Sequence, residues 1–144
     1  IGAWFCPDAT PTLSVSEHPP SPLTNGRMTV EDSASLMALL DAVQHHKQRG
    51  EAGPYWAAPG RPTFQQFSAA VEAGDPLAKR LLEQAAVHHA WLTHHVALLL
   101  DPDRIILAGP LLDLPGYFPL VQRTCLEAGG DDLHRRVTRT ELGP

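Results

Sequence analysis

Residues 72–109 read EAGDPLAKRLLEQAAVHHAWLTHHVALLLDPDRIILAG, and this stretch decides the fold. It predicts a helix start at Asp75-Pro76, because Asp is a favourable N-cap and Pro loses no hydrogen bond at the first helical position. Apolar residues at helical spacing continue to about Leu100, and Asp101-Pro102 predicts the end of the helix. At ~1.5 Å per residue this helix spans roughly 35 Å. Its apolar stripe consists of Ala78, Leu82, Ala85, His89, Leu92, Val96 and Leu99.

The stretch after this helix predicts a strand, a helix and a second strand. Arg104 to Ala108 is short and apolar, which is typical of a buried strand. A helix is predicted over residues 117–127 and ends at Gly129-Gly130, and a final strand lies near residues 136–140. Helices followed by strand–helix–strand predict an α/β fold in which the long helix packs on a small sheet.

Two further helices are predicted before the long one. The first begins at Thr29, with Asp32 in its first turn, and stops at Gly50. The second begins at Thr63, which forms a capping box with the glutamine three residues later, and stops at Gly74. Residues 1–28 are rich in proline and predict an irregular opening. The length predicts one domain over residues 1–144, with a helical and α/β body over residues 29–144.

Composition excludes several classes of function. The net charge is −5, because 16 acidic residues outnumber 11 lysines and arginines, so this chain has no basic surface for DNA. DNA contact is therefore expected only through a separate domain. Cys6 and Cys125 cannot form a CxxC clamp and are expected to be unpaired thiols of a reducing compartment. The apolar run Val96–Leu100 is far shorter than the ~18 residues of a membrane span, so we expect no membrane partner and a cytoplasmic protein.

Histidines occur as neighbours at residues 45–46, 88–89 and 94–95. A helical zinc site needs ligands four residues apart, and these separations place most of the histidines on different faces. They are expected on a helix flank that is partly exposed or faces a dimer partner, with a pH-sensitive interface as the alternative. No GxSxG, P-loop or GxGxxG motif is present.

The long helix and the strand after it carry a resemblance to a known family. The EAGDPLA helix start, the LLDP helix end and a strand that runs into Ala108-Gly109 resemble the C-terminal part of the ROK proteins (repressor, open reading frame, sugar kinase). Ile1-Gly2 and residues 26–31 resemble two earlier segments of that family. The resemblance implies the helix-rich part of an actin-like ATPase (RNase H-like) lobe.

The resemblance also implies site residues. Glu31 matches a glutamate that binds a sugar hydroxyl in the family, although an acid in the first turn of a helix is the alternative reading. Ala108 and Gly109 match the glycine pair beside the nucleotide, and the methyl group and the following Pro110 should narrow an adenine site. The ATP site is therefore expected to be partial at best.

The same comparison predicts that zinc is absent and that the chain has no catalytic residue. In the family one histidine and three cysteines hold a structural zinc, whereas Ala3 and Thr29 stand at the histidine position and at one cysteine position here. The phosphate loop and catalytic aspartate of the family precede the matched segment. The chain is therefore not expected to be a complete catalyst.

Three functions remain open from the sequence. The first is the sugar-effector-binding and dimerisation portion of a ROK-type transcriptional regulator, as a homodimer. The second is a fragment of a divergent ATP-dependent sugar kinase. The third is a structural module that dimerises through its long helix.

Overall fold

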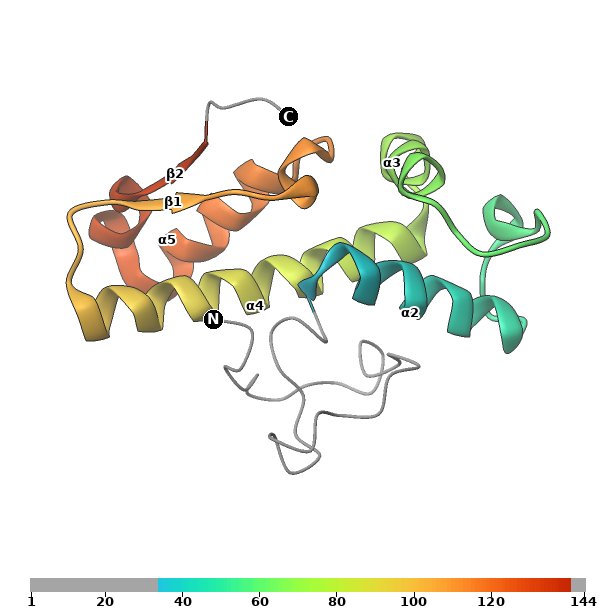
Figure 1. Ribbon diagram of the computed structural model, residues 1–144, viewed down its shortest axis with the longest axis horizontal. Helices are drawn as coiled ribbons and strands as arrows, with labels where there is room; N and C mark the ends of the chain where they lie inside the picture. The colour runs from blue at the N-terminus through green and yellow to red at the C-terminus, as the bar shows by residue number, and fades with distance from the viewer. Residues whose placement is uncertain (1–33, 141–144) are drawn as a thin grey trace. The chain divides into compact units, whose positions relative to one another are not determined.

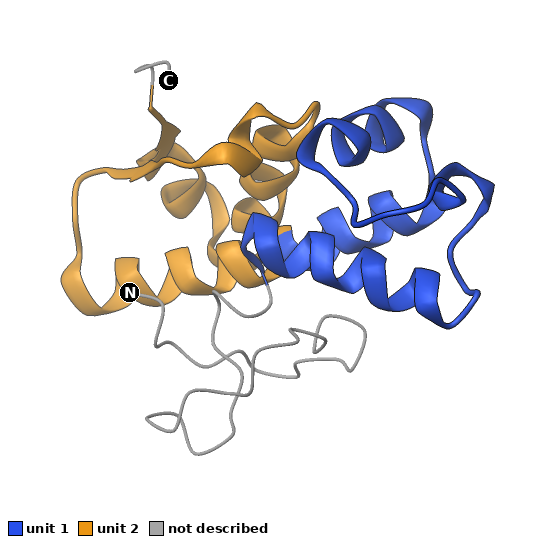
Figure 2. Cartoon of the chain, turned by 45° about the vertical axis from the view of Figure 1, so that its right-hand side comes forward, with its two compact units in different colours: residues 1–85 blue, residues 86–144 orange. Residues whose placement is uncertain are grey.

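The computed structural model describes residues 34–140 (Figure 1). The chain forms two compact units, residues 1–85 and 86–144 (Figure 2). Helix α4, Pro76–Leu100, begins in the first unit and ends in the second. The irregular opening predicted for residues 1–28 lies outside the described residues, and the single domain over residues 1–144 stays a prediction.

Helix α2, Leu36–Gln48, begins later than the sequence predicts. Its N-cap is Ser35, whose backbone is extended and whose hydroxyl accepts a hydrogen bond from the backbone N–H of Ala38 at 3.1 Å. One unbroken helix from Thr29 is therefore wrong, because the extended backbone of Ser35 interrupts it. The predicted stop is confirmed, since Gly50 takes a left-handed φ of 71° just beyond the helix end.

Helices α3, Phe64–Ala73, and α4 begin and end where the sequence predicts. The capping box of α3 is present, because Thr63 and Gln66 each accept a hydrogen bond from the other's backbone N–H. Gly74 ends α3 with a φ of 77°. Neither α4, with its 25 residues, nor any other helix within residues 34–140 combines the length and hydropathy of a membrane span.

The first unit has a core between α2, α3 and the first half of α4. The short 3₁₀ helix η2, Pro54–Trp56, adds Trp56, whose ring lies 6.1 Å from that of Phe67 between centroids. The Trp56 Nε1–H donates to Oδ1 of Asp75 at 3.0 Å. The largest fully buried side chains of this unit are Leu39, Val43, Phe67 and Leu81.

The second unit contains the strand–helix–strand order that the sequence predicts. Strand β1, Ile105–Leu107, leads through the 3₁₀ helix η3, Pro110–Asp113, to helix α5, Tyr117–Arg136, and strand β2, Val137–Arg139. The two strands pair in parallel, with Ile105 beside Val137 and Leu107 beside Arg139. The fold is thus helix-rich α/β, with a two-stranded parallel sheet among residues 34–140.

Two predictions about this sheet need correction. Strand β1 is not buried, because Ile106 is 62% exposed. Successive side chains of a strand point to opposite faces, so Ile106 points away from the face that Ile105 and Leu107 share. The second correction concerns the helix beside the sheet, because the sequence predicts the long helix there. The helix with the more extensive contacts to the sheet is α5, which packs against β2 (Figure 1) and in turn contacts α4.

The glycine pair in α5 acts differently from the predicted helix end. Gly130 has a non-helical backbone with φ 71° and ψ −169°, so the helix is kinked there and then continues to Arg136. Gly129 stays helical and lies against α4. A Cβ atom on Gly129 would stand 2.6 Å from Leu133 Cδ2 and 2.8 Å from His94 Nδ1. The two helices can therefore approach closely only because this position has no side chain.

This close approach predicts the effect of Gly129→Ala. Alanine normally stabilises a helix by ~0.5–1 kcal/mol relative to glycine, but here the clash should outweigh that gain and lower the free energy of unfolding by about 1–3 kcal/mol. Urea unfolding measures the change. The control is Gly53→Ala, because a Cβ there meets its nearest neighbour at an ordinary 3.8 Å. A Gly129→Ala chain as stable as the wild type would contradict this packing.

Candidate functional site

The exit of β1 is an exposed corner of the second unit. Ala108, Gly109 and Pro110 are all exposed. Gly109 has φ 132° and ψ 166°, a conformation that only glycine adopts readily. A Cβ at this residue would have no atom within 4 Å. The backbone at Gly109 is therefore open to a ligand from outside.

The residues on both sides of this corner are anchored. The N–H of Thr140 donates to the carbonyl of Leu107 at 2.9 Å, which extends the pairing of the strands. The carbonyl of Gly109 accepts from the N–H of Leu112 at 3.1 Å. Leu111 and Leu114 are buried below the corner. The chain therefore presents Gly109 on a fixed turn.

The other end of β1 is held by an ion-pair cluster. Arg136 donates to Asp101 at 2.7 Å and to the carbonyl of Pro102 at 3.1 Å, and it pairs with Asp132 at 2.8 Å. Hydrogen bonds to Asp101 first, and to Asp132 second, raise the pKa of Arg136. Asp101 also ends α4 with a φ of 41°. Asp101 therefore ends α4, as the sequence predicts, and it also binds Arg136 at the end of α5.

His89 and Tyr117 form a buried polar pair between α4 and α5. The Nδ1 atom of His89 and the phenol oxygen of Tyr117 share a hydrogen bond, and Tyr117 is only 1% exposed. Burial first, and the neighbouring His88 second, lower the pKa of His89 to about 4. Burial also raises the pKa of Tyr117. Both groups are therefore neutral near pH 7, so the pair supports packing rather than proton transfer at that pH.

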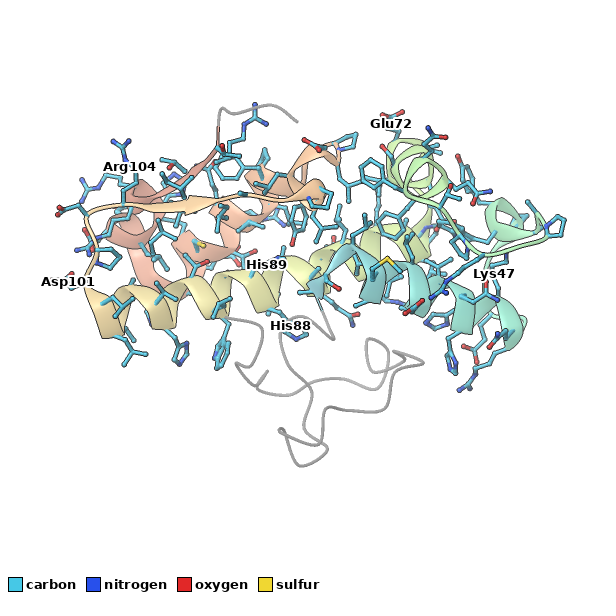
Figure 3. The ribbon with its side chains drawn as sticks, viewed as in Figure 1. Lys47, Glu72, His88, His89, Asp101 and Arg104 are labelled. Atoms are coloured by element: carbon cyan, nitrogen blue, oxygen red, sulfur yellow. The ribbon has the colours of Figure 1, made fainter. Side chains whose placement is uncertain are left out.

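The other histidines of α4 have separate surroundings, and His88 lies on another side of the helix than His89 (Figure 3). His88 is 6% exposed, so the predicted exposed flank is wrong for this residue, and burial lowers its pKa. His94 lies against α5, and His95 stacks on Trp91 with ring centroids 4.2 Å apart. Among residues 34–140 no three His, Cys, Asp or Glu side chains are grouped as a metal ion would require.

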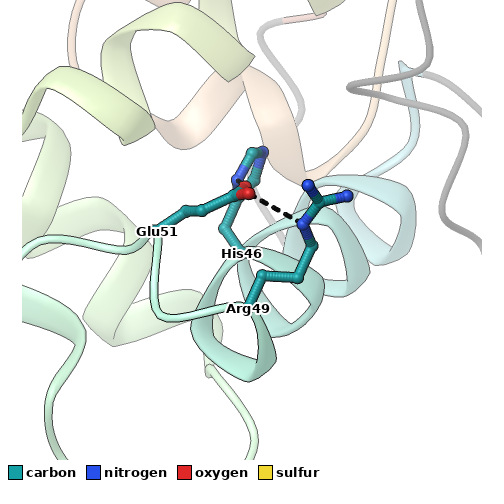
Figure 4. A network of polar contacts seen from close by, with 3 residues as sticks. All are labelled: His46, Arg49 and Glu51. Atoms are coloured by element: carbon teal, nitrogen blue, oxygen red, sulfur yellow. Dashed lines mark hydrogen bonds and ion pairs between the residues drawn. The ribbon is translucent and has the colours of Figure 1, made fainter.

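A polar network fastens the loop after α2 in the first unit (Figure 4). Glu51 accepts from His46 at 2.9 Å and from Arg49 at 2.7 Å. Lys47 donates to the carbonyls of Ala58 and Gly60 at 2.8 Å each. The loop is thus tied to the end of α2 at several points.

Asp41 and Cys125 are two further buried side chains among residues 34–140. Asp41 is 4% exposed and is neutralised by an ion pair with Arg61. Cys125 is buried and free, and burial raises the pKa of its thiol to about 11, so it is protonated and unreactive near neutral pH.

The predicted site residues are not brought together by the described part of the chain. Ala108 and Gly109 lie at the corner after β1, whereas Glu31, Ala3, Cys6 and Thr29 lie outside the described residues. Sequence reasoning missed the pairs His89–Tyr117, Asp41–Arg61 and Trp56–Asp75. A histidine within the predicted apolar stripe of α4 was the one available signal, because a polar residue at a core position needs a partner.

The low pKa of His89 predicts how stability depends on pH. The unfolded chain takes up this proton near pH 6.5 and the folded chain near pH 4, so the contribution of His89 is complete above pH 6.5 and is lost as the pH falls toward 4. One such group lowers the free energy of unfolding by at most ~1.4 kcal/mol per pH unit in this window.

Urea unfolding of the wild type and of His89→Gln between pH 7 and pH 4.5 tests this dependence. Glutamine can keep a hydrogen bond to Tyr117 but does not titrate, so the variant should lose less stability as the pH falls. Parallel curves for the two chains would mean that His89 is accessible to protons in the folded state.

Comparison with known proteins agrees with the pattern of α4 and β1. The ROK family model matches residues 26–137, which include every helix and strand described above except the last residues of β2. A search of the curated proteins and a search of the solved structures each returned no match. Since the family match covers well over half of the 144 residues, the chain belongs to the ROK family.

Proposed function

We propose that this chain is the sugar-effector-binding and dimerisation portion of a ROK-type transcriptional regulator of the cytoplasm. ROK membership supports a sugar kinase or a regulator of this family. The observation that favours a regulator is the corner after β1. There the exposed methyl group of Ala108 and the ring of Pro110 flank Gly109, at the position where the family has a glycine pair. A nucleotide that lies against the backbone needs the space that these atoms occupy.

Two features of the sequence support the same proposal. Ala3 and Thr29 remove two of the four zinc ligands of the family, so zinc does not support the fold here. The net charge of −5 leaves DNA contact to a separate helix-turn-helix domain. Glu31 is the proposed sugar ligand, since a carboxylate can accept hydrogen bonds from two neighbouring hydroxyls.

A divergent ATP-dependent sugar kinase is the second candidate, and Gly109 favours it. Its backbone conformation and the open space around its Cα would admit a nucleotide on one side of the corner. In that case Ala108 and Gly109 would contact the nucleotide and Glu31 the sugar to be phosphorylated.

Ligand-dependent melting separates these candidates. Free aldohexoses and ketohexoses are added one by one to the chain, and MgATP is added in a parallel series. The regulator predicts stabilisation by a sugar, which amounts to ~2.7 kcal/mol at 100 times its Kd, and no shift with MgATP. Stabilisation by MgATP would favour the kinase, and no shift with any sugar would leave the structural module.

Glu31→Gln tests the proposed sugar ligand in a sugar-binding chain. Loss of the charged acceptor should weaken binding by about 1–3 kcal/mol, measured by calorimetry, while the melting temperature without sugar stays the same. The matched control is Glu72→Gln, which alters an exposed carboxylate on α3 (Figure 3). Equal affinities for the three chains would remove Glu31 from the site.

A further inference from the structure

We draw no further inference here: the strongest candidate, the exposed apolar surface of Leu98, Leu99 and Leu100 at the end of α4, carries nothing because no feature of residues 34–140 shows what covers it.

Discussion

A single carboxylate oxygen, Oδ1 of Asp75, accepts hydrogen bonds from Trp56 Nε1 at 3.0 Å and from the backbone N–H of Ala78 at 2.9 Å. Asp75 is 8% exposed, so it would lose its hydration without replacement if these donors were absent. One of the two bonds starts α4, and the other fastens η2 to that start. The same carboxylate therefore joins the start of α4 to η2 within the first unit.

The second half of α4 shows how a helix can lie close to a neighbour without charge. Ala86 and Ala90 are buried, and Gly129 of α5 leaves room for His94. The one polar ring that points toward Tyr117 is His89, and its pKa of about 4 keeps it neutral where a charge would be costly. A glycine and a neutral histidine thus lie at the contact between α4 and α5.

Local signals in the sequence predicted most element boundaries. The Thr63 capping box, Asp75-Pro76 and the glycines at 50 and 74 act within a few residues, so their effect can be read without the fold. The burial of β1 could not be predicted in this way, because it depends on which elements cover each face of the sheet. The pairs Trp56–Asp75 and His89–Tyr117 join residues 19 and 28 positions apart, and no local pattern indicates such partners. The site was predicted only by resemblance, and for Glu31 the described residues do not extend far enough.

The geometry of Gly109 has two explanations, and they differ in what they require of its neighbour. The turn alone needs a glycine there, because the chain passes from β1 to η3 with a φ of 132° while Leu107 and Leu111 are both held in place. A glycine at this position is therefore expected with or without a nucleotide. Ala108 has no such constraint, since the fold accepts either residue at an exposed strand end. A nucleotide would favour the smaller residue at this position. The methyl group of Ala108 therefore indicates more about function than Gly109 does, and it supports the proposed regulator over the kinase.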